Sequence, residues 1–131
     1  MCTLRSLCTK LARSFSTLLL LFLPSLSVAS DLSGRVVAIL DGETIEVLHD
    51  RTTERIRLAG IDCPEKKQPF GQRAKQATSA LSFAPHVTVR SAAKESLWAH
   101  SGTVELTDGT NLNHELVRQG WCWWYWKYAT G

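Results

Sequence analysis

Apolar and polar residues alternate along three short segments that follow one another after residue 30. Val, Ile and Leu recur in them at or near every second position, which is typical of a strand with one buried face. The three segments are 33–40, 44–48 and 55–61. Turn-forming residues separate them, such as Asp41-Gly42 between the first two. The pattern predicts a three-stranded meander with short connections.

A helical period replaces the alternation in the second half of the chain. Ala and Leu recur at helical spacing over 72–83, and Pro85 ends that segment. Two more alternating segments and a short helix that stops at a glycine complete the pattern, at 86–90, 103–106 and 113–119. This order, β-β-β-α-β-β-α, predicts a mainly β fold with helices, a five-stranded barrel of OB type. Barrels of this kind commonly bind nucleic acids or sugars, but the architecture alone does not define a function.

The first 29 residues follow neither pattern. Three basic residues precede the six-residue apolar run 18–23, and small residues follow it up to Ser30. This three-part layout predicts a secretory signal peptide cleaved near Ala29, with the OB-type domain in 30–131. The alternative is an uncleaved membrane anchor, although the run is much shorter than the roughly 20 residues of a spanning helix. We therefore expect a secreted or periplasmic protein with no stable membrane association after cleavage.

The predicted cleavage also changes the charge and the cysteine content. The chain has 15 Lys and Arg against 12 Asp and Glu, and the three excess basic residues all lie in the predicted signal. A nearly neutral domain would need a local cluster of charge to attract an anion. Cys63 and Cys122 remain, and in an oxidising compartment they could form a disulfide. Closing a loop of about 60 residues would stabilise the fold by roughly 4 kcal/mol. Two buried free thiols are the alternative.

Charged residues gather around the end of the third predicted strand. Arg57 stands between Ile and Leu, and Asp62 and Glu65 follow in the next turn, while Asp41 and Glu43 lie in the first turn. Hydrolysis of a phosphodiester needs a carboxylate that acts on water and cations that neutralise phosphate, and a guanidinium matches two phosphate oxygens. Calcium takes oxygen ligands. The two segments predict one metal and phosphate site. The alternatives are that Asp41 only caps its turn and that Arg57 and Glu65 form a structural ion pair.

Four motifs together resemble the staphylococcal nuclease (thermonuclease) family over about residues 36–128. They are Asp41-Gly-Glu-Thr44, Arg55-Ile-Arg-Leu-Ala-Gly-Ile-Asp-Cys-Pro-Glu65, Gln68-Pro-Phe-Gly71 and Asn113-His-Glu-Leu-Val-Arg-Gln-Gly120. The resemblance implies an OB-like barrel with three helices. It also implies a calcium-dependent endonuclease that hydrolyses DNA and RNA and releases 3′-phosphates. We expect a monomer.

The resemblance also implies roles for individual residues. Arg57 resembles the arginine that contacts the scissile phosphate, and Glu65 the carboxylate that orients or deprotonates water. Glu43 and Asp62 resemble the acidic calcium ligands, and the backbone carbonyl of Cys63 falls at a position that completes the calcium shell. A carbonyl ligand does not depend on its side chain, so a cysteine is acceptable there.

The chain departs from the family pattern in three places. Glu43 stands where the family has Asp, and His100 stands at the position of a second catalytic arginine. The third helix of the family has no counterpart, which suggests a C-terminally truncated copy. These departures predict weak activity, or activity confined to acidic pH, since a neutral histidine carries no charge. The alternatives are a non-catalytic OB-like module that binds nucleic acid or protein, and a fragment that does not fold alone.

Six of the eight residues 121–128 are aromatic. They could cover the core, which we expect for most of them because Trp is seldom exposed in a small domain. They could also stack on bases. The substrate-binding residues we predict are Trp98, Trp126 and Tyr128.

Overall fold

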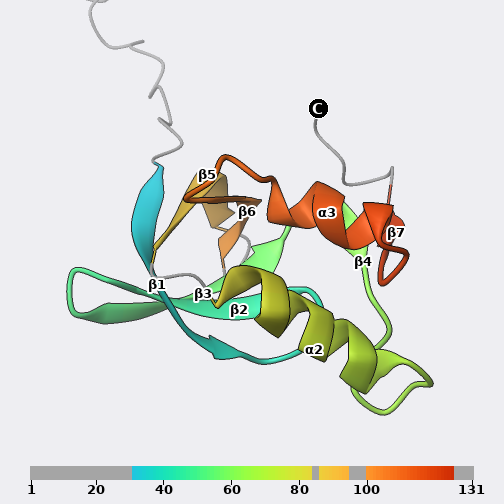
Figure 1. Cartoon of the computed structure of the whole chain (residues 1–131). Coiled ribbons are helices and arrows are strands. Elements are labelled where there is room, and N and C mark those ends of the chain that lie inside the picture. Colours follow the sequence, from blue (N-terminus) through green and yellow to red (C-terminus); the bar gives the residue numbers. More distant parts are fainter. Residues whose placement is uncertain (1–30, 84–85, 95–99, 126–131) are drawn as a thin grey trace, which may run out of the picture.

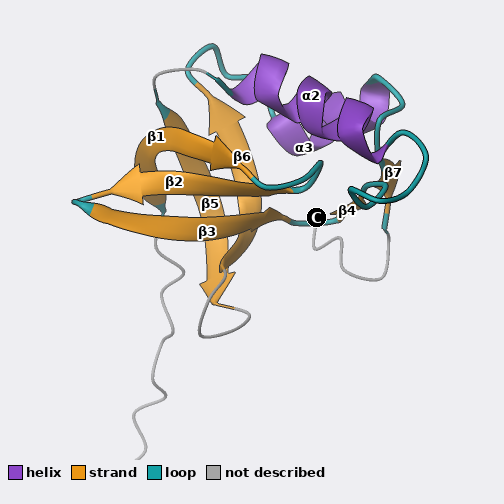
Figure 2. Cartoon of the chain, turned by 90° about the horizontal axis from the view of Figure 1, so that it is seen from below, coloured by secondary structure: helices purple, strands orange, loops and turns teal. Residues whose placement is uncertain are grey.

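Five strands close into a barrel in the computed structural model, which describes residues 31–83, 86–94 and 100–125 (Figures 1 and 2). The barrel order is β1-β2-β3-β6-β5. Its strands are β1 (Leu32–Ile39), β2 (Thr44–His49), β3 (Thr52–Leu58), β5 (Val87–Lys94) and β6 (His100–Leu106). Among the described residues, the helices are α2 (Gly71–Ser82) and α3 (Leu112–Arg118). The predicted fold class is confirmed.

The barrel closes through one parallel contact. β1 pairs antiparallel with β2 and β5, and β2 pairs antiparallel with β3, which is the predicted meander. β3 then pairs parallel with β6, so residues distant in the sequence become neighbours. Register shifts between Val36 and Ala38 and between Arg90 and Ala93 bend the strands around the barrel. The end of β3 is thereby placed beside the start of β6.

The core fills the barrel and extends under the helices. Alternate residues of the strands point inward, and those of β2 and β3 are almost fully buried, namely Ile45, Val47, Ile56 and Leu58. Leu112 and Leu116 of α3 join the same core. Figure 2 shows both helices side by side at one end of the barrel. In the described part of the chain, no helix is long and apolar enough to cross a membrane.

A second, two-stranded sheet lies beside the barrel. β4 (Ile61–Asp62) follows β3, and it pairs antiparallel with β7 (Trp123–Trp124), which follows α3. Next to this pair, Cys63 and Cys122 form a disulfide with their Cα atoms 4.3 Å apart. The structure thus contains the predicted disulfide and excludes the two free thiols. The sheet and the disulfide tie the segment after β3 to the segment after α3.

The aromatic segment is less buried than we expected. Trp121 packs against the core, but the exposed fractions of Trp123, Trp124 and Tyr125 are 50%, 45% and 39%. The expectation that these rings cover the core is wrong for these three residues. The reason is that β7 has one partner strand of two residues, so its side chains have little surface to pack on. Trp124 instead contacts His114 edge-on, with ring centroids 5.4 Å apart.

A buried amide joins α3 to the barrel, and its loss should destabilise the fold. Asn113 is 1% exposed; its Nδ2 donates to the carbonyls of Ala59 and Gly102, and its Oδ1 accepts from the Val104 amide. We expect Asn113→Ala to lower the free energy of unfolding by roughly 2–4 kcal/mol, because buried groups lose their partners. Asn111→Ala, which removes only the helix cap, should cost about 1 kcal/mol. Urea denaturation measures both, and equal losses would contradict this account.

Candidate active site

The turn between β1 and β2 is fixed from two sides. The Glu43 amide donates to Oδ1 of Asp41 at 3.0 Å, so Asp41 caps the turn as one of the sequence interpretations proposed. The Thr78 hydroxyl, buried in α2, donates to the Gly42 carbonyl at 2.6 Å. A Cβ atom at Gly42 would lie only 2.9 Å from that of Cys63. The turn is therefore packed tightly between α2 and the Cys63 loop, and it gives Glu43 a defined position.

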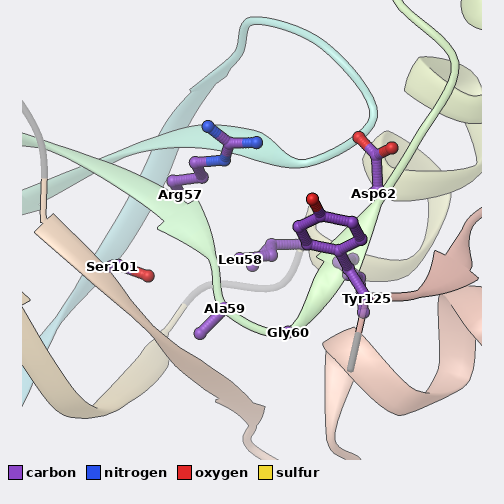
Figure 3. Close-up of a pocket in the computed structure, with 8 residues that line it drawn as sticks. Arg57, Leu58, Ala59, Gly60, Asp62, Ser101 and Tyr125 are labelled. Carbon is purple, nitrogen blue, oxygen red and sulfur yellow. The ribbon is translucent and has the colours of Figure 1, made fainter. Parts of the chain in front are cut away.

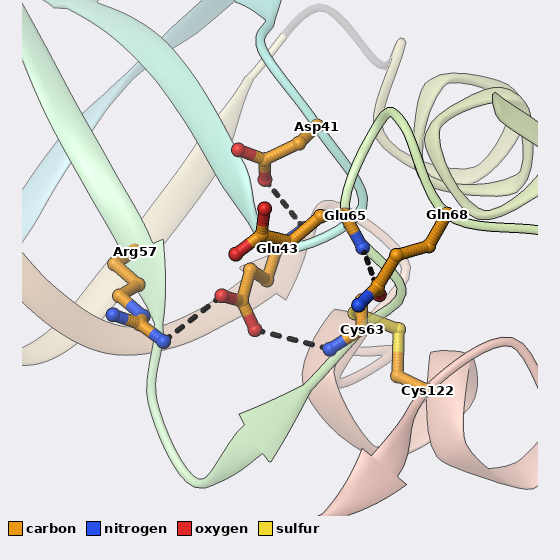
Figure 4. A network of polar contacts seen from close by, with 7 residues as sticks. All are labelled: Asp41, Glu43, Arg57, Cys63, Glu65, Gln68 and Cys122. Atoms are coloured by element: carbon orange, nitrogen blue, oxygen red, sulfur yellow. Dashed lines mark hydrogen bonds and ion pairs between the residues drawn. A yellow bond between two sulfur atoms is a disulfide. The ribbon is translucent and has the colours of Figure 1, made fainter. Parts of the chain in front are cut away.

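Glu43 is the ion-pair partner of Arg57. Its Oε1 lies 2.9 Å from Nη2 of Arg57, and its Oε2 accepts from the Cys63 amide at 3.2 Å (Figure 4). The Glu43 side chain is 15% exposed, whereas that of Arg57 is 52% exposed. The ion pair of Arg57 that the structure contains is therefore with Glu43 and not with Glu65. About half of the Arg57 side-chain surface therefore remains open to a ligand.

Burial raises the pKa of Glu43 to about 7. The carboxylates of Asp62 and Asp41 raise it as well, while the Arg57 guanidinium and the Cys63 amide act in the opposite direction. One guanidinium therefore does not compensate the burial of this carboxylate among other acids. A group in this setting gains free energy from a nearby cation.

The raised pKa predicts a pH-dependent stability without calcium. Between about pH 4.5 and 7 the unfolded chain loses the Glu43 proton while the folded chain keeps it, so stability falls as pH rises through this window. Glutamine does not titrate, so we expect Glu43→Gln to abolish this loss. Relative to the parent, the free energy of unfolding of the variant should be roughly 1–3 kcal/mol more favourable at pH 8 than at pH 5. Urea denaturation in EDTA at both pH values tests this. Glu46→Gln on the adjoining strand β2 is the control, and a similar pH effect there would contradict the assignment.

Arg57 opens onto a pocket of about 500 Å³. The pocket is lined by Arg57, Leu58, Ala59, Gly60, Ile61, Asp62, Ser101 and Tyr125. In Figure 3 the Arg57 guanidinium, the Asp62 carboxylate and the Tyr125 hydroxyl face a common space. A guanidinium can bind phosphate oxygens and a carboxylate can bind a metal, so this pocket has the groups that a phosphodiester requires.

A second hollow, of about 470 Å³, holds the other acids. Its lining consists of Asp41, Gly42, Glu43, Cys63, Pro64, Glu65, Lys66 and Lys67. Glu65 is held by its backbone: its amide donates to Oε1 of Gln68 at 2.9 Å, and its carbonyl accepts from the Gln68 amide at 2.8 Å. Arg57 thus lines the first hollow and Glu43 lines the second. The ion pair between them joins the two hollows into one site.

The donor groups of this site match a calcium ion in chemistry. In the part of the chain that the structure describes, no three His, Cys, Asp or Glu side chains are close enough to hold a metal alone. Calcium also accepts carbonyls and water as ligands. The carboxylates of Glu43 and Asp62 and the Cys63 carbonyl are hard oxygen donors, and the pKa of Glu43 is raised mainly by burial, to which the Asp62 and Asp41 carboxylates add. These three residues could hold calcium with water completing the shell.

Comparison with known proteins supports the predicted family. Residues 55–130 match the family described as Staphylococcal nuclease homologue. An uncharacterized endonuclease of Escherichia coli O157:H7 is 42% identical over 113 residues, which are 86% of this chain and 74% of that protein. The chain belongs to the staphylococcal nuclease family. Micrococcal nuclease of Shigella flexneri is 40% identical over 108 residues, which are 76% of this chain and 62% of that protein.

Within this staphylococcal nuclease fold, His100 and Ser101 lie on opposite faces of β6. His100 pairs with Ile56 and Ser101 with Arg57. Ile56 is fully buried, so the His100 side chain lies on the core-facing side, with Nε2 3.5 Å from Oε2 of Glu54. Ser101 shares the pocket with Arg57. The residue beside Arg57 is thus Ser101, and a catalytic role of His100 stays a prediction.

Two residues that line the pocket were not predicted from the sequence, and three predicted substrate-binding residues lie outside the described part of the chain. Trp98, Trp126 and Tyr128 lie outside the described residues, so their predicted contact with substrate stays a prediction. Ser101 and Tyr125 line the pocket but were not predicted. The aromatic run did indicate this region, but which ring faces the pocket depends on the pairing of β4 with β7, and this pairing has no signal in the sequence.

Proposed function

We propose that this member of the staphylococcal nuclease family is a calcium-dependent nuclease that hydrolyses phosphodiester bonds of DNA or RNA. The observation that carries the proposal is the half-exposed Arg57 side chain, which forms an ion pair with the partly buried Glu43 carboxylate and lines one pocket with Asp62. A basic group for the phosphate and acids for a cation therefore meet in one place. The names of the relatives as endonucleases support the same reaction class.

Each residue of the site has a defined part in this proposal. Arg57 would bind the phosphate through the guanidinium nitrogens that its ion pair with Glu43 leaves open. Glu65 would orient or deprotonate the attacking water. Glu43, Asp62 and the Cys63 carbonyl would hold calcium, which supplies positive charge to the phosphate when it is bound. We further propose that the protein acts as a monomer after export, secreted or in a periplasm, as the signal-like pattern before residue 30 indicates.

Binding of nucleic acid without cleavage is the second candidate function. One observation favours it: His100, at the predicted position of the second arginine, lies against Glu54. Among the described residues that line its pocket, Arg57 is then the only basic one. One basic residue compensates less of the charge that develops on the phosphate during cleavage than two would, which favours binding over cleavage.

Cleavage and binding can be measured on the same protein. Linear single-stranded DNA and RNA are incubated with the protein in calcium or in EDTA, from pH 5 to 9, and binding is followed by fluorescence anisotropy. Cleavage in calcium that stops in EDTA supports the nuclease. Binding without cleavage by a protein that circular dichroism shows to be folded would refute the nuclease and support the binding module.

A further inference from the structure

The Cys63–Cys122 disulfide lies directly against the acidic turn (Figure 4). The Cys63 amide donates to Oε2 of Glu43 at 3.2 Å. A Cβ atom at Gly42 would be 2.9 Å from Cβ and 3.4 Å from Sγ of Cys63, so this side chain packs on the turn itself. Asp62 immediately precedes Cys63 in the sequence. The disulfide therefore contacts both segments that supply the acids of the site.

The other half of the disulfide is anchored at the end of α3. The amides of Trp121 and Cys122 both donate to the Leu116 carbonyl, at 3.0 and 3.4 Å, which fixes Cys122 on the core. Both cysteines are only 5% exposed. The disulfide thus connects the Cys63 loop to a rigid helix end.

Without the disulfide, Ile61 would still pack in the core, but few other contacts would keep Asp62 and Cys63 in place. The β4–β7 ladder joins two residues to two, and a backbone bond from Tyr125 to the Gly60 carbonyl extends it. The two β7 side chains are about half exposed and contribute little buried surface. A ladder of this size is marginal in water. The barrel core has other support, because its inward-facing residues come from the five long strands.

We propose that the Cys63–Cys122 disulfide is a thiol–disulfide switch of the acidic site. Oxidised, it holds the Cys63 amide on Glu43 and the Cys63 carbonyl next to Asp62; reduced, it releases this loop while the barrel stays folded. In the oxidation, two thiols of the protein transfer two electrons and two protons to a disulfide oxidant, which becomes two thiols. Opening of the small ladder gives the reductant access to the buried sulfur atoms. The effect on cleavage rests on the proposed function.

The first test follows the loop itself in calcium-free protein. Hydrogen exchange of the Cys63 amide is measured by NMR in the oxidised protein, in dithiothreitol, and in the double variant Cys63→Ala, Cys122→Ala. We expect exchange at Cys63 to become at least about tenfold faster in the reduced protein and in the variant. The amides of Val47 and Ile56 in the barrel should keep their protection. Unchanged exchange at Cys63, or loss of protection throughout the barrel, would overturn the switch.

The second test measures calcium binding by calorimetry and cleavage at limiting calcium. Reduction should weaken calcium binding and slow cleavage by about tenfold or more, and oxidised glutathione should restore both. The double variant should resemble the reduced protein and show no response to dithiothreitol. Equal calcium affinity of the oxidised and reduced proteins would overturn the proposal. If no form cleaves, the proposed nuclease fails, while hydrogen exchange and calcium binding still decide on the switch.

Discussion

Replacing Arg57 with alanine is expected to lower kcat/KM for cleavage of single-stranded DNA by about 100-fold or more. Its side chain is half exposed, lines the pocket with Asp62, and is the basic group there among the described residues. Removing one donor that stabilises developing charge typically costs factors of about a hundred to a thousand. Arg57→Lys should recover only part of the activity, because an ammonium cannot bind two phosphate oxygens as a planar fork does. Initial rates at saturating calcium measure the effect.

Arg55 offers a matched control on the same face of β3. It lies two residues before Arg57, and its Nη2 is 3.1 Å from Oε1 of Glu46, away from the pocket. Arg55→Ala removes the same charge from the same strand, and we expect its kcat/KM to stay within about twofold of the parent, as for a surface ion pair. Similar losses in the two variants would show that net charge matters and that Arg57 has no specific role.

The first two strands could be predicted almost to the residue, but the third could not: it was predicted at 55–61, whereas β3 is Thr52–Leu58 and Ile61 begins β4. The predicted segment 44–48 became β2 at Thr44–His49, and the first helix differs by one residue at each end. β5 and β6 are longer than predicted, since they extend to Lys94 and begin at His100. The added residues have no apolar alternation. They are strands because Lys94 and His100 pair across β5 and β6, and cross-strand pairing of this kind is not encoded in a local pattern.

The candidate site could be predicted in its composition but not in its pairings. The two charged motifs indicated Glu43, Arg57, Asp62 and Glu65, and the structure places them around two adjoining hollows. That Arg57 binds Glu43 depends on how the turn after β1 packs on the Cys63 loop. Such tertiary contacts follow from the whole fold, so local sequence reasoning could name the charged groups but not the bonds between them.

The parallel contact of β3 with β6 leads to a gain-of-function prediction. Ser101 is paired with Arg57 and shares its pocket, so an arginine at this position would extend into the space that Arg57 faces. We expect Ser101→Arg to raise kcat/KM by about tenfold or more, because a second guanidinium would stabilise charge on the phosphate. The two neighbouring cations should also weaken the fold by roughly 0.5 kcal/mol, which urea denaturation would detect.

His100→Arg is the informative counterpart, because it tests the position that the sequence alone indicated. An arginine there would replace the His100 contact with Glu54 by a stronger ion pair on the core-facing side of β6. It would therefore stay away from the phosphate, and we expect activity within about twofold of the parent, because an ion pair between partly exposed side chains has a small effect. Cleavage rates of both variants at pH 7 distinguish the two positions. If His100→Arg raises activity and Ser101→Arg does not, the start of β6 must rearrange when substrate binds, and the register of β3 with β6 no longer defines the catalytic face.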